Sequence, residues 1–536
     1  MSTAPSWRST AAWRSSRFGI MAPLSNLGLK FREIARANAE RPALRQTDGE
    51  ITTYAQLDGL SNWLASVFLE RGLRRGDVVG ILHDKSPGAL AAMLACLKVG
   101  CIYTNLDPDS PWERLRKILR SCEPKVIING FPGMPHAAEF QRQQSVVIHL
   151  REPAFATAWQ RHDTTESPGL DDVTGADPAY IMFTSGSTGI PKGALMSHAN
   201  VLNFVAWAQD RFQLTPADIL SNVNPMFFDN SVFDFYAAIF SGASMVPVSS
   251  TQVREPAQLI GVINRIGCTI WFSVPSLLVF LLTTRSLSAG DFPAVRTIIF
   301  GGEGFPKTKL KQLYDLFGGR ADLENVYGPT ECTCICSAHT VVPSDFTDMK
   351  ALAPLGFLGA NFDCEILAKS DATDVGELFL RGPGVGLGYY HDPERSREVF
   401  VQNPVDHQFE DIGYRTGDLV RRDASGRLHF VGRADFQVKH MGYRIELEEI
   451  EAALNSVAEV RECAVIYRKI RDGLGEIIGF VALSRPKPPE QLIRDVAGII
   501  PPYMVPKHVT VLENLPKNAS GKIDRQTLQT LTSAAA

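Results

Sequence analysis

The sequence predicts an α/β protein with a large N-terminal domain of parallel or mixed sheets, covered by helices, and a small, mobile α+β C-terminal domain. A chain of 536 residues is too long for a single core. Helical and extended segments alternate along the early chain, which is typical of parallel sheets covered by helices. The composition changes near Gly432, which predicts a domain boundary there.

The early elements follow one another in a regular order. Leu57, Leu60, Leu64 and Phe68 recur at helical spacing and stop before Gly72, which predicts a helix. We then expect strands at 78–82, 101–105 and 125–129, helices at 88–99 and 112–120, and the same pattern through 200–209, 262–272 and 297–300.

The C-terminal part reads as a separate unit. We expect helices at 447–453 and 489–497 and strands at 462–467 and 477–483. The large domain is therefore assigned to residues 29–432 and the small domain to residues 433–536.

The first twenty residues are rich in arginine and serine and lack acids, as transit peptides do. For residues 1–28 we favour a disordered tail, or a start site placed too early, because Met21 begins a more ordinary N-terminus.

Composition and charge exclude several classes of partner. The chain is 45% hydrophobic and 21% charged, and its net charge of −4 gives no reason to expect nucleic acid or an anionic membrane. The longest apolar run, near Ala89–Leu97, is too short to span a bilayer and is followed by Lys98. We expect a cytoplasmic protein that is a monomer or a weak dimer.

Nine cysteines are spread along the chain without zinc-ligand spacing. Cys332, Cys334 and Cys336 alternate, so they share one face only if that segment is extended, and tetrahedral zinc would still lack a fourth ligand. We expect reduced, buried thiols, as in cytosolic proteins.

The most informative segment runs from Thr184 to Gly193, Thr-Ser-Gly-Ser-Thr-Gly-Ile-Pro-Lys-Gly, after the apolar run Ala179–Phe183. Glycines let backbone N–H groups turn toward an anion, hydroxyls donate further hydrogen bonds, and a lysine adds positive charge. The Walker spacing is absent. The pattern predicts a buried strand followed by a phosphate-binding loop, whose candidate ligands are Thr184, Ser185, Ser187, Thr188 and Lys192.

This order resembles the core signature of the adenylate-forming superfamily, which includes acyl-CoA synthetases, luciferases and the adenylation domains of nonribosomal peptide synthetases. The resemblance extends over nearly the whole chain. It implies that a carboxylate is activated with ATP and Mg²⁺ as an acyl-AMP, that pyrophosphate is released, and that the acyl group passes to a thiol. It also implies catalytic roles for Thr184, Glu331 and Lys522.

A second signature, Tyr327-Gly328-Pro329-Thr330-Glu331, follows in the family's order. The resemblance assigns Tyr327 to stacking on adenine, Gly328 to the nucleotide site, Thr330 to a phosphate and Glu331 to Mg²⁺. One hard carboxylate, together with phosphates and water, suits that ion.

Three further motifs complete the nucleotide site that the resemblance implies. Gly301, Gly302 and Glu303 follow a predicted strand and resemble the adenine-contacting segment, at the strand end where α/β sheets bind ligands. The remaining assignments are the ribose ligand Asp418, the nucleotide contact Arg433, the hinge Asp435 and the closing lysine Lys522. The family uses two closures of its small domain, one for adenylation and one for thiolation.

The segment Phe228–Phe233 resembles the Phe-Asp-x-Ser stretch of amino-acid-activating domains, where the aspartate pairs with the substrate's ammonium group. A buried Asp229 carboxylate needs a cationic partner; the alternative is a helix cap or turn residue. The family's specificity positions correspond to Asp229, Asn230, Phe233, Phe272, Ile299, Gly301, Val326, Cys334 and Ile335, with Leu220 narrowing the far end. This lining predicts a small or medium aliphatic amino acid.

The chain ends at Ala536, shortly after Lys522, with no room for a carrier domain. We therefore expect a stand-alone enzyme that loads the phosphopantetheine thiol of a discrete carrier protein. It resembles the β-amino-acid-selective group of macrolactam biosynthesis, although Asp229 serves an α- or a β-amine equally well. The alternatives are a carboxylate–CoA ligase for an amine-free acid and a non-catalytic nucleotide-binding scaffold. Glu331, Asp418 and Lys522 argue against the scaffold.

Overall fold

The computed structural model describes residues 26–152, 172–349, 352–368, 374–470, 475–518 and 523–533. Most of the predicted tail, and Lys522, lie outside the described residues. The first helix begins at Leu27, two residues before the expected start of the large domain. The Asn26 side chain caps this helix at the amide of Leu29, and the amide of Leu27 donates to His198 Nδ1.

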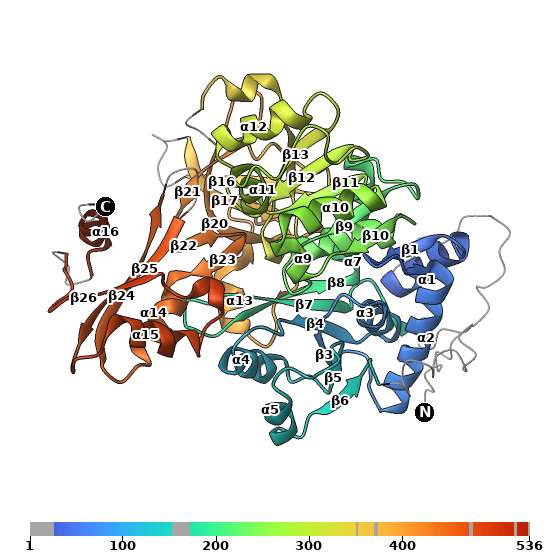
Figure 1. Cartoon of the computed structure of the whole chain (residues 1–536), viewed down its shortest axis with the longest axis horizontal. Coiled ribbons are helices and arrows are strands. Elements are labelled where there is room, and N and C mark those ends of the chain that lie inside the picture. Colours follow the sequence, from blue (N-terminus) through green and yellow to red (C-terminus); the bar gives the residue numbers. More distant parts are fainter. Residues whose placement is uncertain are drawn as a thin grey trace, which may run out of the picture.

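Two sheets with parallel centres form most of the large domain (Figure 1). In spatial order the first comprises β18 (Gly388–Tyr389), β8 (Lys192–Ser197), β7 (Pro178–Thr184), β4 (Ile102–Leu106), β3 (Val78–Leu82), β5 (Val126–Asn129) and β6 (Val146–His149). Strands β7, β4, β3, β5 and β6 are parallel, whereas β8 and β18 are antiparallel.

The second sheet has nine strands. They are β15 (Phe357–Leu358), β14 (Ser337–Thr340), β13 (Asp322–Tyr327), β12 (Thr297–Gly301), β11 (Ile270–Ser273), β9 (Ile219–Asn222), β10 (Ser244–Pro247), β1 (Pro42–Arg45) and β2 (Ile51–Thr53). Pairing is parallel from β13 to β1 and antiparallel at both edges. The carboxyl ends of β12 and β13 therefore lie side by side.

A third, fully antiparallel sheet closes the large domain and was not predicted. It contains β16 (Asp363–Ala368), β17 (Val375–Arg381), β20 (Ile412–Arg422), β19 (Phe400–Gln402) and β21 (Leu428–Arg433). Because β21 pairs with β20, Arg433 still belongs to this sheet, and the chain leaves it at Ala434 and Asp435.

The small domain has the predicted α+β composition. A hairpin of β22 (Gln437–His440) and β23 (Tyr443–Glu446) leads into the helix α14 (Leu447–Asn455). A three-stranded sheet follows, with β24 (Val460–Lys469), β25 (Gly475–Leu483) and β26 (His508–Val511), accompanied by α15 (Pro489–Ala497) and α16 (Arg525–Ser533).

Helices cover the large sheets, as the sequence predicts. They are α1 (Leu27–Ala37), α2 (Tyr54–Glu70), α3 (Pro87–Val99), α4 (Trp112–Cys122), α5 (Ala137–Arg142), α7 (His198–Arg211), α8 (Asn230–Val232), α9 (Ser250–Arg254), α10 (Pro256–Ile266), α11 (Pro275–Thr283), α12 (Lys307–Phe317) and α13 (Pro393–Val399). The main core joins both sheets and includes the fully buried side chains of Phe31, Tyr103, Tyr180 and Tyr236. No described helix is long and apolar enough to cross a membrane.

All nine cysteines lie in the described part of the chain, where each is buried and unpaired. Cys332, Cys334 and Cys336 were expected to share one face only if their segment were extended, and it is not. Residues Thr330–Cys332 form a helical turn, and Cys334 has a φ of 74°, so the segment is not extended.

Candidate active site

A pocket lies where β7, β12 and β13 end, and residues of the hairpin β22–β23 of the small domain form part of its lining. The large domain contributes Arg114, Met182, Phe183, Thr184, Ser185, Phe228, Asp229, Asn230, Phe272, Gly301, Gly302, Val326, Tyr327, Gly328, Pro329, Thr330, Cys334, Ile335, Asp418 and Arg433. The small domain contributes Gln437, Lys439, Gly442, Arg444, Tyr503 and Met504. Motifs far apart in the sequence therefore line one space.

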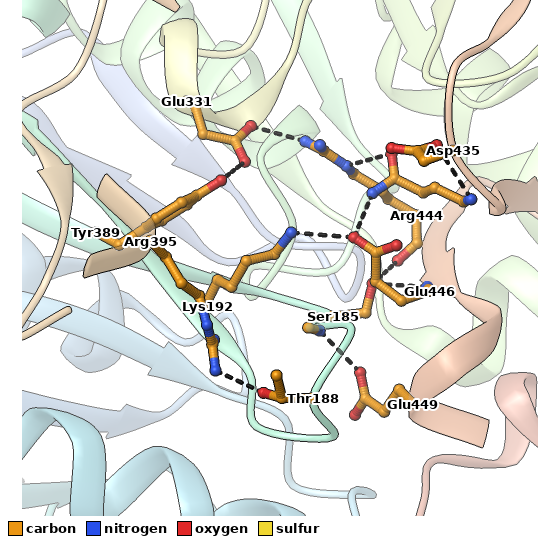
Figure 2. Close-up of polar contacts among 12 residues, drawn as sticks. Ser185, Thr188, Lys192, Glu331, Tyr389, Arg395, Asp435, Arg444, Glu446 and Glu449 are labelled. Atoms are coloured by element: carbon orange, nitrogen blue, oxygen red, sulfur yellow. Dashed lines mark hydrogen bonds and ion pairs between the residues drawn. The ribbon is translucent and has the colours of Figure 1, made fainter. Parts of the chain in front are cut away.

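The predicted phosphate-binding loop joins β7 to β8, and its donors face carboxylates of the small domain (Figure 2). Ser185 Oγ accepts from the amide of Glu446 at 3.0 Å, and the amide of Gly186 donates to Glu449 Oε2 at 3.1 Å. Lys192 Nζ lies 3.0 Å from Glu446 Oε1. The small domain thus places two carboxylates where an anion would meet the loop.

The other loop residues differ in exposure. Thr184 Oγ1 is buried at the pocket and has no hydrogen-bond partner among the described residues. Ser187 and Thr188 are exposed at the loop tip, where Thr188 Oγ1 accepts from Arg395 at 2.5 Å. A buried hydroxyl without a partner is costly, so Thr184 has capacity for a ligand.

Glu331 is completely buried and both of its carboxylate oxygens have partners (Figure 2). Tyr389 Oη donates to Oε1, and Arg444 Nη1 donates to Oε2, both at 2.7 Å. Burial opposes ionisation, but the charges of Arg444 and Lys192 outweigh it and lower the pKa of Glu331 to about 2. In this arrangement the carboxylate does not fit Mg²⁺, because a guanidinium already stands beside it.

The predicted nucleotide residues Tyr327, Asp418 and Arg433 meet in the structure. Tyr327 Oη donates to Asp418 Oδ2, and Arg433 Nη1 donates to Asp418 Oδ1, both at 2.6 Å. Arg433 also pairs with Asp435 at 2.6 Å. Lys439 Nζ lies 5.4 Å from the centre of the Tyr327 ring, and burial lowers its pKa.

The glycine segment after β12 brings two residues to the pocket. A Cβ at Gly301 would stand 2.5 Å from the carbonyl oxygen of Val326, so that position requires glycine. Gly302 also lines the pocket. Glu303 does not: its carboxylate accepts from the amides of Ser276 at 2.7 Å and Gly442 at 3.0 Å. Glu303 therefore joins the large domain to the tip of the hairpin in this arrangement.

Asp229 faces the pocket and is not a helix cap. It precedes α8, but its side chain makes no capping hydrogen bond. Its Oδ2 accepts from Thr330 Oγ1 at 2.6 Å. Burial raises the pKa of Asp229, while the hydrogen bond from Thr330 and the charge of Arg444 act in the opposite direction.

The apolar side of the pocket includes some of the predicted specificity positions and not others. Asn230, Phe272, Val326, Cys334 and Ile335 line it. Leu220, Phe233 and Ile299 are fully buried in the core behind it. The Phe233 ring packs edge-on against Phe272, with 5.2 Å between ring centres, and only Phe272 lines the pocket.

Comparison with known proteins identifies the family. The model of the AMP-binding enzyme family matches residues 31–390, and the model of the AMP-binding enzyme C-terminal domain matches residues 449–522. The chain belongs to the AMP-binding enzyme family. Its expected membership in an adenylate-forming group is thereby confirmed at the family level.

Two relatives illustrate the range of lengths within this family. Tyrocidine synthase 3 of Brevibacillus parabrevis is 33% identical over 491 residues, which are 90% of this chain but only 7% of that protein. The L-proline--[L-prolyl-carrier protein] ligase of Streptomyces coelicolor is 32% identical over 529 residues, covering 93% of this chain and 95% of the ligase.

A solved structure shows the same fold. The NRPS protein PA1221, which contains adenylation and PCP domains, superposes with a TM-score of 0.79 at 24% identity, covering 94% of this chain and 84% of that chain. The expected α/β architecture with a smaller C-terminal domain is confirmed.

The described residues fit an AMP-binding enzyme's nucleotide. Thr184 supplies a buried hydroxyl without a partner, Gly301 and Gly302 open the end of β12, and Asp418 offers acceptor oxygens beside the Tyr327 ring. These residues would hold the adenosine and the α-phosphate. The remaining phosphates would compete with Glu446 and Glu449 for the loop. Lys522 lies outside the described residues, so its predicted role stays a prediction.

Several pocket residues were missed by sequence reasoning. They are Arg114, Met182, Phe183, Gln437, Lys439, Gly442, Arg444, Tyr503 and Met504. Six of these nine belong to the small domain, which reaches the pocket only in the folded chain. The charged residues Lys439 and Arg444 lie within one hairpin. Alternation of polar and apolar residues predicts its strands but not which part of the large domain they contact.

Proposed function

We propose that this enzyme uses ATP to adenylate a small or medium aliphatic amino acid, releases pyrophosphate, and transfers the aminoacyl group to the phosphopantetheine thiol of a separate carrier protein in natural-product biosynthesis. The observation that carries the proposal is Asp229. This carboxylate faces the pocket, caps no helix and is desolvated, so a protonated amine is the partner that offsets its burial.

The rest of the pocket supports an uncharged side chain on the substrate. Apart from Asp229 and Asn230, the acyl side is formed by Phe272, Val326 and Ile335 together with Cys334. Phe233, Leu220 and Ile299 are buried in the core and do not line the pocket, and we infer that the pocket favours a short side chain. A single methylene changes binding by only about 1–3 kcal/mol, so close homologues should also react.

The chemistry that we propose depends on charge placement and not on a covalent enzyme intermediate. The substrate carboxylate attacks the α-phosphorus of ATP, an acyl phosphate bond forms, and pyrophosphate leaves. Lys522, in the closure used for adenylation, would neutralise charge that develops during attack. Glu331 would hold Mg²⁺, which would neutralise phosphate charge, only in a closure that removes Arg444 from its carboxylate. Asp435 would be the hinge between the two closures.

The relatives support a carrier protein as acceptor. The Streptomyces coelicolor ligase, matched over 95% of its length, is named for an L-prolyl-carrier protein. A second ligase of the same name, from Pseudomonas fluorescens, is 34% identical over 467 residues. For the substrate, we keep the sequence-based expectation of a β-amino acid as the first class to test.

ATP–pyrophosphate exchange over matched α-amino, β-amino and amine-free acids tests this function. We expect exchange only with amine-bearing acids, strongest for a short aliphatic side chain. Exchange with amine-free acids alone would instead establish the carboxylate–CoA ligase.

A lysine variant separates catalysis from nucleotide binding. Lys522→Ala should slow adenylate formation by about 10²–10³ while ATP still binds. Equal accumulation of acyl-AMP in the wild type and in Lys522→Ala would show that Lys522 does not take part in adenylation. If the wild type formed no acyl-AMP with any acid, the non-catalytic scaffold would be favoured.

A further inference from the structure

Asp234 is a fully buried carboxylate that does not line the pocket. It belongs to a π-helical turn, Phe233–Ala237, which continues the segment that carries Asp229 and Asn230. Such turns are frequent at functional sites, although the turn alone assigns no role. A buried charge is costly unless its surroundings compensate it, so the partners of Asp234 indicate what it holds in place.

Two asparagine side chains donate to the same oxygen of this carboxylate. Asn222 Nδ2 donates to Asp234 Oδ2 at 2.8 Å, and Asn224 Nδ2 donates to it at 3.0 Å. Both asparagines are buried, Asn222 at the end of β9 and Asn224 two residues later. Asn222 Nδ2 also donates to the carbonyl oxygen of Asn224 at 3.2 Å. The carboxylate therefore fixes the chain where it leaves β9.

Asn224 connects Asp234 with the acyl side of the pocket. A side-chain amide has two hydrogens, so it can serve two acceptors. Asn224 Nδ2 donates to the carbonyl oxygen of Phe272 at 3.1 Å as well as to Asp234. Phe272 lies in β11 and lines the pocket. One asparagine thus joins the strand that carries this ring to the helical segment that follows Asp229.

The network is anchored in both large sheets. Lys85 follows β3 of the first sheet, and its Nζ donates to the carbonyl oxygens of Asn222 and Val248 in the second, both at 2.8 Å. Burial raises the pKa of Asp234, and the charge of Lys85 acts in the opposite direction. All of these contacts lie within the large domain, and none uses a residue assigned to the nucleotide. They therefore do not depend on the position of the small domain or on bound ATP.

We propose that Asp234 is a positioning residue for the acyl side of the pocket, which acts through Asn224 to hold Phe272 in place relative to the segment that carries Asp229. The proposal rests on the proposed function in requiring that this pocket holds the acid, but it does not require an amine. It predicts that Asp234 affects recognition of the acid and leaves recognition of ATP unchanged.

Three variants separate loss of the hydrogen bonds from loss of charge and from general destabilisation. Asp234→Ala removes the acceptor, whereas Asp234→Asn keeps a carbonyl oxygen that can accept from both asparagines. Asp58→Ala is the control, because Asp58 pairs with the buried Lys98 and does not line the pocket. We measure KM and kcat by pyrophosphate exchange for ATP, for the acid that gives the fastest exchange in the panel above, and for its homologue with one more methylene.

Asp234→Ala should raise the KM of the acid about tenfold and leave that of ATP within about twofold, because two buried amides lose their acceptor and Phe272 is no longer held. Preference for the acid over its longer homologue should fall at least about threefold. Asp234→Asn should stay within about threefold of the wild type, and Asp58→Ala should change neither KM.

A merely structural role gives a different pattern. A lower kcat with unchanged KM values in both alanine variants would overturn the proposal. A raised KM for ATP alone, or an Asp234→Asn variant as impaired as Asp234→Ala, would also overturn it.

A double variant tests whether Asp234 acts through Asn224. Asn224→Ala alone should raise the KM of the acid about as much as Asp234→Ala does. Adding Asp234→Ala to it should change that KM by less than about threefold, because the connection to Phe272 is already lost. Additive effects would overturn the proposal. If Asp234→Ala does not fold, Asn224→Ala decides alone, and an unchanged KM of the acid would then overturn the proposal.

Failure of the proposed function gives a different result. If only amine-free acids support exchange, that function is wrong, and the role of Asp234 is measured with those acids. If amine-bearing acids support exchange but the Asp234 variants behave like Asp58→Ala, only the role of Asp234 is wrong.

Discussion

Asp229 shows how one desolvated carboxylate can select a substrate. Burial raises its pKa, and the hydrogen bond from Thr330 together with the charges of Arg444 and Lys439 offsets only part of that effect. An ammonium group supplies both the opposite charge and further hydrogen bonds. An amine-free acid supplies neither, so binding energy at this position depends on the amine.

Replacing Asp229 by alanine should therefore abolish selection for the amine. We expect pyrophosphate exchange with the amino acid to fall about 100-fold, since truncating one partner of a buried charge pair costs about 2–5 kcal/mol. ATP binding, measured by calorimetry, should not change. Asp315→Ala, on an exposed helix surface, is the control. Unchanged exchange in Asp229→Ala would reassign the residue to structure.

Two buried histidines make stability depend on pH. Burial lowers the pKa of His83 and of His198 from 6.5 to about 4. Above pH 6.5 both are neutral in the folded and unfolded states and contribute nothing. As the pH falls from 6.5 to 4, the unfolded chain binds protons that the folded chain does not, so the free energy of unfolding falls.

This loss should be on the order of 3 kcal/mol for each histidine. Denaturant unfolding at pH 7 and pH 4.5 measures it. His198→Asn, which keeps an acceptor for the amide of Leu27, should lose less stability on acidification than the wild type. An equal loss in both proteins would show that His198 does not contribute.

At the scale of elements, the hairpin β22–β23 forms the small-domain side of the site. Its tip, Met441 and Gly442, has positive φ at both residues, 52° and 80°. The amide of Gly442 donates to Glu303. A Cβ at Gly442 would stand 2.4 Å from Val274, so the hairpin can dock here only with glycine at the tip.

Gly442→Ala should weaken this docking. Gly426→Ala is a matched control, because Gly426 also has positive φ, at 89°, but a Cβ there would meet its nearest neighbour at an ordinary 3.8 Å. We expect Gly442→Ala to slow transfer to the carrier thiol at least about tenfold while pyrophosphate exchange persists. Intact-protein mass spectrometry of the carrier measures transfer. Equal slowing in both variants would attribute the effect to backbone strain.

Local sequence patterns predicted the elements better than they predicted the contacts. The strand expected at 78–82 is β3, because five consecutive apolar residues are buried on both faces. The segment 262–272 contains the end of α10 and all but the last residue of β11. Gly267, with a φ of 76°, ends the helix between them.

Long-range geometry explains what the sequence could not predict in the site. Nothing local indicates that Glu331 meets Arg444, 113 positions away, or that Lys192 meets Glu446, 254 positions away. The family's specificity positions likewise identify residues in the sequence, but they do not tell which side chains reach the pocket. Phe272 and Phe233 are both apolar aromatics, yet only Phe272 reaches the pocket.

Across the whole molecule, the two domains meet through complementary charges. Lys192 and the amide of Gly186 on the large domain bind Glu446 and Glu449 of the small domain, and Arg444 binds Glu331 in return (Figure 2). Phosphates of ATP would bind the same groups, Lys192 and the amide of Gly186. Carboxylates and phosphates are both anions, so we expect a bound triphosphate to compete with this domain arrangement.

Neutralising the two carboxylates should favour the nucleotide. We expect Glu446→Gln/Glu449→Gln to lower the KM for ATP about three- to tenfold, because competition for the loop is reduced, and to slow transfer to the carrier. Glu448→Gln, which neighbours Glu449 in α14, is the control. A raised KM for ATP in the double variant would contradict this competition.

A crystal structure with a non-hydrolysable aminoacyl-AMP analogue would show whether Asp229 binds the substrate's ammonium group. We expect the analogue's nitrogen within hydrogen-bond distance of the Asp229 carboxylate. An Asp229 side chain turned away from that nitrogen would show that the residue does not recognise the amine.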